Sequence, residues 1–390
     1  QMVVDGDAAA SLGRLGRERW AWVCSKPPVQ AHLDSDHDPW PESITPVLHD
    51  IDIGIARTLP AHKDRDEVRE VEHLYLDSIQ AARHFIYIEN QYFTSYRIAQ
   101  ALANRLENAD GPEVIIVMPE KTGGWLEQHT MDVLRSRLFR DLRRADRHHR
   151  LRVFYVRLQE NPHVSLMVHA KVMIIDDRFA RVASSNLSSR SMGLDSECDL
   201  AVDAANTLDR REAISNFRRR LLAEHLGRDI VTVANAEKTH GSVIKAIDAL
   251  RDNERTLEPL ENNIPESVDH WVPDIELLDP EKPIEPDEMF DYFVSPDQQR
   301  PMIRHQFKAG LLIFGVLVLA ALWRWTPLGE WIDVDTAAAV GQWIDDRPFT
   351  PLLVMAIYVI AGSAGVPITL MIIATVMVFG PWPGMLYALA

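Results

Sequence analysis

Short apolar runs alternate with amphipathic stretches along roughly the first two thirds of this chain. Val114–Met118 and Phe85–Ile88 are uninterrupted apolar runs of the length expected for buried strands. Residues 65–83 and 125–145 instead place apolar side chains three or four positions apart, which is typical of helices that pack on one face. The alternation predicts an α/β domain with helices on both faces of a sheet.

The same patterns predict the remaining elements of this domain. Expected strands lie at 2–6, 151–156, 169–175, 179–183 and 198–202, and expected helices at 8–20, 95–108, 209–226 and 242–252.

The hydrophobic pattern changes after residue 300. Ala309–Trp323 contains 15 residues without a charge, fewer than the roughly 20 of a spanning helix, although the flanking basic side chains can reach the lipid interface. Pro348–Ala390 contains 43 residues without a charge. We expect a first transmembrane helix over 301–328, with a buried core helix as the alternative, and membrane-embedded structure over 348–390.

Charge divides the chain further. The formal net charge is −16, and Leu257–Gln299 holds 13 acidic residues, one lysine and seven prolines. Self-repulsion and proline favour an extended linker over 257–300. The rest of the chain is close to neutral, so no basic domain is present and we expect no nucleic-acid partner.

The two cysteines, Cys24 and Cys198, lack the spacing of metal ligands, so we interpret them as reduced structural thiols. No cluster in the sequence indicates a bound metal or another cofactor. Since the first residue is Gln1 and no secretory signal follows, we expect the chain to begin partway through a longer protein.

The candidate chemistry lies between His169 and Asn186. His169 and Lys171 are two positions apart, so on a strand both would point to one face. Ser184, Ser185 and Asn186 follow the next predicted strand and are small hydrogen-bonding residues. A cation, neutral donors and an imidazole together suit the cleavage of a phosphodiester.

This arrangement resembles the signature of the phospholipase D superfamily. His169-x-Lys171-x4-Asp176, followed after six residues by Ala183-Ser184-x-Asn186, matches the family pattern, except that alanine replaces the usual glycine. The alanine is a mild change where φ is negative. The segments 86–93 (IYIENQYF) and 191–197 (SMGLDSE) are similar to the second half of eukaryote-type phospholipases D.

The resemblance implies a mixed-sheet sandwich built from two related halves. Residues 1–60 would be the remainder of the first half, whose motif lies upstream of Gln1, and residues 61–256 would be the second catalytic half. The complementary half-site would come from the missing N-terminal half of the same protein or from a homodimer partner. The substrate would be a phospholipid.

The resemblance also implies roles for individual residues. His169 would act as general acid and later as base, while the other half supplies the histidine that forms a phosphohistidine. Lys171, Ser184 and Asn186 would hold the phosphoryl oxygens, and Glu197 would orient the His169 imidazole. Asp176 is assigned to strand-end structure. Glu89, Asn90 and Gln91 would line the pocket or form strand-end hydrogen bonds.

The segment 348–390 resembles the start of a DedA-type, SNARE-associated (VTT) membrane domain, whose relatives are linked to lipid transport or scrambling. We therefore expect a multi-pass protein of the cell inner (plasma) membrane with a cytoplasmic catalytic domain. The helix over 125–145 also carries basic residues that either contact anionic lipid headgroups or form a solvated face: Arg135, Arg137, Arg140, Arg143, Arg144 and Arg147.

Three functions fit the sequence: a phospholipase D, a cardiolipin-synthase-like phosphatidyltransferase, and a lipid transport or scrambling protein with a degenerate phospholipase D module. The intact His169, Lys171, Asn186 and Glu197 argue against the degenerate module.

Overall fold

The computed structural model describes most of the first 261 residues and two later segments. The described ranges are 2–24, 40–63, 65–123, 125–161, 164–205, 207–251, 254–261, 278–283 and 349–363, with isolated positions beyond. The chain divides into two compact units, Gln1–Glu285 and Pro286–Ala390. The sheet and the candidate site belong to the first unit.

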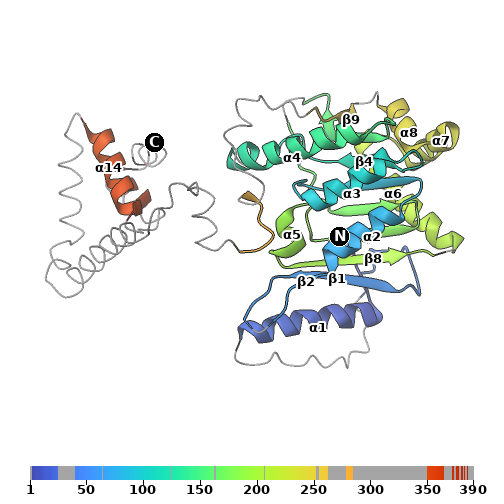
Figure 1. Ribbon diagram of the computed structural model, residues 1–390, viewed down its shortest axis with the longest axis horizontal. Helices are drawn as coiled ribbons and strands as arrows, with labels where there is room; N and C mark the ends of the chain where they lie inside the picture. Colours follow the sequence, from blue (N-terminus) through green and yellow to red (C-terminus); the bar gives the residue numbers. More distant parts are fainter. Residues whose placement is uncertain are drawn as a thin grey trace, which may run out of the picture. The chain divides into compact units, whose positions relative to one another are not determined.

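A mixed nine-stranded sheet forms the centre of the first unit, with the order β2-β1-β8-β7-β6-β3-β4-β5-β9 (Figure 1). Strands β3, β4 and β5 run parallel to one another, and the other neighbouring pairs are antiparallel. The strands are β1 (Ile53–Leu59), β2 (Val68–Arg69), β3 (Phe85–Glu89), β4 (Glu113–Val117), β5 (Leu151–Leu158), β6 (Val172–Ile175), β7 (Phe179–Val182), β8 (Glu197–Asp203) and β9 (Arg255–Pro259).

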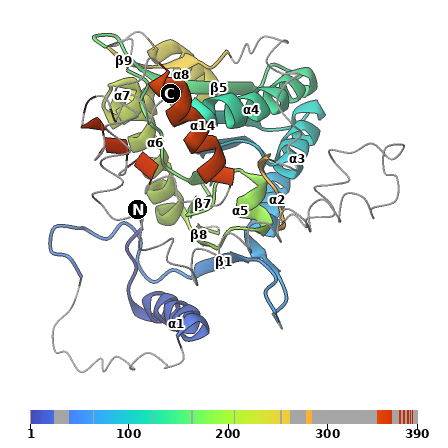
Figure 2. The same ribbon diagram turned by 90° about the vertical axis from the view of Figure 1, so that its left-hand side faces the viewer.

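Helices cover both faces of this sheet, which confirms the predicted layering (Figures 1 and 2). One apolar core lies under α2 (Glu70–Ala81), α3 (Tyr96–Glu107), α4 (Trp125–Ala145) and α5 (Ser189–Gly193). The other lies under α6 (Leu208–Leu226), α7 (Ile230–His240) and α8 (Val243–Leu250).

Strand β3 shows how one sequence serves both cores. Ile86 and Ile88 belong to the core under α2–α5, while Phe85 and Tyr87 belong to the core under α6–α8. Successive side chains of a strand point to opposite faces, so an apolar run of this kind is buried on both sides. The alternation also sends Glu89 to the side of α6.

Several predicted boundaries differ from the structure. Met2–Asp5 form no strand, and the first helix is α1 (Gly6–Val23). The helix predicted from residue 65 begins at Glu70, because Val68 and Arg69 pair with β1. Sequence analysis missed β1, β9 and α7 altogether.

The basic row on α4 is only partly a surface. Arg135 is 1% exposed, and its guanidinium donates to the carbonyls of Pro119 and Glu120 at 2.9 Å each. Including Arg135 in a lipid-contacting face was therefore wrong, since the side chain anchors the loop after β4. Arg143, Arg144 and Arg147 are exposed as predicted.

Parts of the acidic stretch are folded, which corrects the prediction of a linker beginning at residue 257. Leu257–Pro259 belong to β9, where Leu257 is fully buried. Further along, Asp279 is also fully buried: it accepts hydrogen bonds from Thr94 Oγ1 at 2.6 Å and from the Ser189 amide at 2.5 Å. Glu281 pairs with Arg69 at 2.7 Å. Local apolar and ionic contacts thus outweigh charge repulsion at these residues.

The predicted helix over 301–328 lies outside the described residues, as does most of 257–300. Within the predicted membrane segment 348–390, the structure describes α14 (Thr350–Ser363), a 14-residue helix. Among the described residues, no helix has both the length and the hydropathy needed to cross a bilayer.

Candidate active site

His169 and Lys171 lie in the segment that leads into β6. The strand begins at Val172, so both residues precede it, contrary to the strand predicted for them. The His169 side chain is exposed, and among the described residues none hydrogen-bonds to its imidazole. An exposed imidazole at this position is free to meet a substrate.

Lys171 is 9% exposed. Its ammonium donates to the His169 carbonyl at 3.1 Å and to Gln91 Oε1 at 3.3 Å. Burial lowers the pKa of Lys171 below its usual range, while the nearby Glu197 charge favours the protonated form. Lys171 and Gln91 are therefore in direct contact, and their predicted roles in a site stay predictions.

The hairpin partner of β6 delivers the second part of the motif. The Ala183 amide donates to the Lys171 carbonyl at 2.9 Å, which brings the turn Ser184–Asn186 next to Lys171. Ala183 is not among the described residues with positive φ, so alanine in place of glycine introduces no strain there. Asn186 is half-buried, and its Oδ1 is buried without a hydrogen-bond partner among the described residues.

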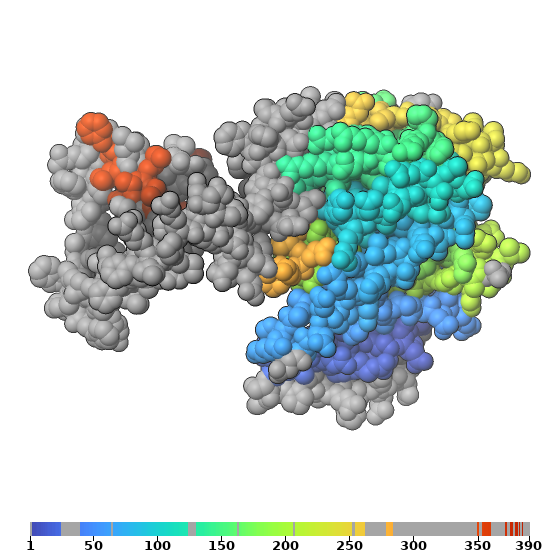
Figure 3. All heavy atoms as spheres, in the orientation of Figure 1, coloured from blue at the N-terminus to red at the C-terminus, as the bar shows by residue number. Residues whose placement is uncertain are grey.

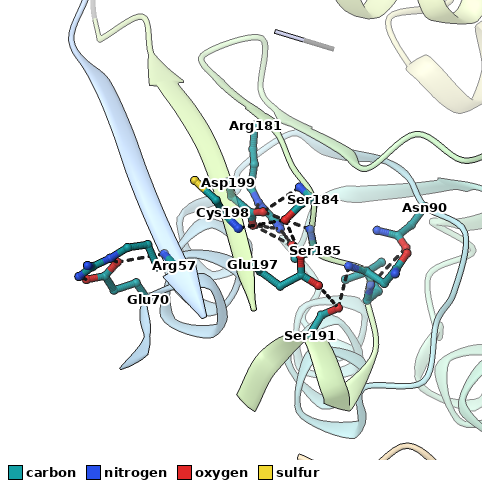
Figure 4. Close-up of polar contacts among 12 residues, drawn as sticks. Arg57, Glu70, Asn90, Arg181, Ser184, Ser185, Ser191, Glu197, Cys198 and Asp199 are labelled. Carbon is teal, nitrogen blue, oxygen red and sulfur yellow. Dashed lines mark hydrogen bonds and ion pairs between the residues drawn. The ribbon is translucent and has the colours of Figure 1, made fainter. Parts of the chain in front are cut away.

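Glu197 is bound by two serine hydroxyls (Figure 4). Ser184 Oγ donates to its Oε2 and Ser191 Oγ donates to its Oε1 at 2.7 Å. The Cys198 amide donates to Ser184 Oγ at 2.9 Å. Burial raises the pKa of Glu197, and the two serine hydroxyls act in the opposite direction. The Glu197 carboxylate therefore contacts serines here, and its predicted contact with His169 stays a prediction.

This geometry bears on the predicted role of Ser184. A hydroxyl has a single proton to donate, and that of Ser184 is directed to Glu197. Donation from Ser184 to a phosphoryl oxygen would require this hydrogen bond to break, so the phosphate-binding role of Ser184 also stays a prediction.

The three consecutive residues Glu89, Asn90 and Gln91 have different hydrogen-bond partners. Glu89 is 2% exposed and receives hydrogen bonds from Tyr87 at 2.6 Å and from His225 of α6 at 3.0 Å. Asn90 Oδ1 accepts the Tyr92 and Leu187 amides at 3.2 Å each, which ties this loop to the Ser184 turn. Gln91 alone contacts Lys171.

Asp176 forms the turn between β6 and β7. Its carboxylate accepts the backbone amides of Arg83, His84 and Phe85 at 2.7–2.9 Å, and its φ of 53° lies in the left-handed region that aspartate tolerates. These contacts secure the start of β3, which is a structural role.

Sequence analysis missed the polar residues that support the motif. Asp199 accepts the Ser184 and Ser185 amides at 3.1 and 3.2 Å and pairs with Arg181 of β7. Since Asp199 is two positions from Glu197 on β8, strand periodicity places both on one face, and this spacing could have identified it.

No group of three or more histidine, cysteine or acidic side chains in the described parts of the chain could hold a metal ion. An open groove of about 410 Å³ lies between α3 and α4, lined among others by Tyr96, Leu138 and Arg147. Its lining contains none of the motif residues, and Figure 3 shows the face that carries these two helices in teal and green. The groove is therefore separate from the candidate site.

The site thus combines an exposed imidazole, a partly desolvated ammonium, an amide side chain with an unpartnered oxygen, and a buried carboxyl with a raised pKa. The ammonium and the amide nitrogen can hold anionic oxygens, and the imidazole can carry a proton. This set can stabilise negative charge that develops on a tetrahedral anionic centre.

Comparison with known proteins finds a matching family model and several curated relatives. A family model described as "Cardiolipin synthase, PLD-like domain" matches residues 75–220. The chain is 24% identical over 281 residues to "Phospholipase D alpha 1" of Carica papaya, covering 52% of this chain and 34% of that protein. It is 30% identical over 220 residues to "Phospholipase D" of Phytophthora infestans, covering 44% and 12% respectively.

Two solved structures are similar at low scores. NucT from Helicobacter pylori gives a TM-score of 0.31 at 21% identity, covering 44% of this chain and 96% of that one. Phosphatidylserine synthase of Haemophilus influenzae Rd KW20 gives a TM-score of 0.34 at 19% identity, covering 44% and 38%. Scores this low carry no argument about the fold.

The chain spans about a third or less of the length of the curated relatives named above. The family match includes the motif residues His169, Lys171 and Asn186. Residues 75–220 are therefore similar to a PLD-like domain.

Proposed function

We propose that this chain supplies one half of a site that cleaves the phosphodiester bond of phospholipids. The observation that carries the proposal is the pairing of Lys171 with Gln91 beside the Ser184–Asn186 turn, within the region matched by the family model. A partly desolvated ammonium beside an exposed imidazole suits the binding and cleavage of an anionic ester.

The proposed reaction proceeds in two steps. A histidine of the complementary half attacks phosphorus and forms an N–P bond, while the bond to the leaving alcohol breaks. His169 gives its proton to that alcohol. In the second step neutral His169 takes a proton from water, whose oxygen bonds to phosphorus while the N–P bond of the phosphohistidine breaks, which frees the attacking histidine and the phosphate product.

In this proposal Lys171 and Asn186 hold the phosphoryl oxygens in both steps, and Glu197 orients His169 once substrate is bound. Catalytic hydrogen bonds commonly tighten only in the substrate complex. Breaking the bond between Ser184 and Glu197 would release both groups for these contacts.

The proposal includes a membrane location. The uncharged sequences after residue 300 would anchor the protein in the inner membrane, in several passes, with the domain of residues 61–256 in the cytoplasm. The anchor would hold the site close to its phospholipid substrate.

A test follows from the half-site. The chain should be inactive as a monomer on bis(4-nitrophenyl) phosphate and on phosphatidylcholine vesicles. It should gain activity when a segment carrying the complementary motif is added, or when it dimerises. Turnover by the purified monomer at the rate of the complete protein would contradict the half-site proposal.

A phosphatidyltransferase is the second candidate, favoured by the description of the matching family model. The two candidates differ in the acceptor of the second step, which is water for the hydrolase and an alcohol for the transferase. Adding glycerol or phosphatidylglycerol to the assay distinguishes them, because the transferase converts the acceptor to a new phospholipid and the hydrolase releases phosphatidic acid.

A further inference from the structure

A charged pair is buried beneath the turn that carries Ser184. Arg181 of β7 is 1% exposed and Asp199 of β8 is fully buried. The Arg181 guanidinium also lies 3.4 Å from the centre of the Tyr75 ring. Replacing a buried ion pair with apolar residues is often neutral or stabilising, so fold stability alone does not account for a charged pair here.

The Asp199 carboxylate binds the backbone of the turn directly. Its Oδ1 accepts the amides of Ser184 and Ser185 at 3.1 and 3.2 Å. Its Oδ2 accepts the Ser185 hydroxyl at 2.7 Å and Arg181 Nε at 2.8 Å. Both oxygens are thus in use, and Arg181 compensates the charge that the carboxylate needs for these bonds.

Hydrogen bonds connect this turn to Glu197 and to Ser191 (Figure 4). Ser184 Oγ donates to Glu197. The Asn186 amide donates to Ser191 Oγ at 3.0 Å, and Ser191 Oγ donates to Glu197 at 2.7 Å. A chain of hydrogen bonds therefore leads from Asp199 through Ser184 to Glu197, and on to Asn186.

We infer that Asp199, held by Arg181, is a positioning residue that fixes the Ser184–Ser185 turn and through it sets the geometry of Asn186 and Glu197. The inference rests on the proposed function for the meaning of those two residues in catalysis. It assigns to Asp199 and Arg181 no contact with the substrate.

A second buried arginine provides a matched control. Arg218 of α6 is 1% exposed and lies 4.7 Å from the Phe85 ring centre. Its guanidinium binds Asp177 at 2.8 Å and also Glu237, which links the β6–β7 turn to α6 and α7. Its chemistry and burial match those of Arg181, but its carboxylates do not bind the Ser184 turn.

The test compares two double variants of the chain, assembled with its complementary half-site. Arg181→Met/Asp199→Leu removes the pair under the turn, and Arg218→Met/Asp177→Asn alters the control. Thermal unfolding, hydrogen exchange of the Ser184 and Ser185 amides, and kcat and KM on bis(4-nitrophenyl) phosphate are measured for each, with rates expressed per folded molecule.

The first variant is expected to fold and to exchange those two amides about ten-fold faster or more. Its kcat should fall about 100-fold with a smaller change in KM, because small displacements of reacting groups have effects of this size. The control should leave exchange and kcat unchanged. Arg181→Lys keeps a cation beside Asp199 and should retain most of the wild-type kcat.

Unchanged exchange at Ser184 and Ser185, or wild-type kcat in a folded Arg181→Met/Asp199→Leu variant, would overturn the positioning role. Hydrogen exchange needs no substrate, so it judges this role even where the proposed function fails. A wild-type protein that cleaves no phosphodiester would contradict the proposed function alone.

Discussion

Two buried glutamates, Glu197 and Glu89, occupy opposite faces of the same sheet and differ in their hydrogen-bond partners. Glu197 is 8% exposed and Glu89 is 2% exposed. Glu197 accepts hydrogen bonds from two serine hydroxyls, those of Ser184 and Ser191. Glu89 instead accepts hydrogen bonds from Tyr87 and from His225 of α6. The sequence predicted a catalytic role for Glu197, and for Glu89 either a place in the pocket lining or strand-end hydrogen bonds.

The difference lies in which groups surround each carboxyl. Glu197 influences Lys171, and burial moves the pKa of both groups toward neutrality, upward for the acid and downward for the amine. Groups perturbed in this way are frequent at catalytic sites. Glu89 instead closes a local network between β3 and α6, and burial raises the pKa of its partner Tyr87 well above the usual value. Its contacts are those of a structural carboxyl.

The largest loss of activity should come from the substitution Lys171→Met, on the face of the sheet that carries Glu197. Removing the cation leaves the phosphoryl oxygens without their charged partner, so kcat should fall by about 1,000-fold. Lys245→Met, at an exposed lysine of α8, is the matched control and should keep wild-type activity. Activity within a few-fold of wild type in a folded Lys171→Met protein would remove Lys171 from the site.

Glu89→Gln should separate stability from activity. Tyr87 and His225 both bind Oε1 of the Glu89 carboxylate, and a neutral amide oxygen accepts such bonds more weakly than a charged one, so the free energy of unfolding should fall by about 1–3 kcal/mol. The kcat per folded molecule should stay within about three-fold of wild type, as for a structural group. Urea unfolding and initial rates measure the two quantities. A loss of kcat comparable to that of Lys171→Met would place Glu89 in the catalytic site.

The smallest effect is a change in the pH dependence of stability. Since the folded-state pKa of Glu197 is raised above its ordinary value of 4.5, the folded protein binds this proton more tightly than the unfolded chain. The resulting stabilisation is complete below the unfolded pKa and is lost as pH rises through the folded pKa. Glu197→Gln removes this contribution.

Urea midpoints measured from about pH 4 to about pH 7 test this sign. The wild type should lose stability relative to Glu197→Gln as pH rises across the window. Parallel curves for the two proteins would show that burial does not raise the pKa of Glu197.

The sequence predicts much of this fold where periodicity is strong. The helix over 125–145 has the predicted bounds, and the buried strand at 85–88 differs from β3 by one residue. The sequence did not predict β1, which lies beside the edge strand β2, or the edge strand β9, because tertiary pairing and not local pattern defines them. Strand β9 was also missed because the residues around Leu257 are rich in acidic side chains, which favour an extended linker.

The contacts within the candidate site are harder to predict from the sequence than the fold is. A motif places residues in order along the chain, but strand alternation decides which face each one reaches, and β3 directs Glu89 away from Lys171. The hydrogen-bond partner of Glu197 also depends on the turn geometry at Ser184. The buried pair of Arg181 and Asp199 belongs to no known motif. The sequence does show, however, that Asp199 is two positions from Glu197.

The most direct test of the account is the rate of bis(4-nitrophenyl) phosphate hydrolysis by the assembled protein and by its His169→Asn variant. His148→Asn, at an exposed histidine outside the motif, serves as the matched control. The account predicts that His169→Asn lowers kcat by at least about 100-fold with thermal stability unchanged, while His148→Asn retains wild-type activity. A folded His169→Asn protein that hydrolyses the diester at the wild-type rate would contradict it.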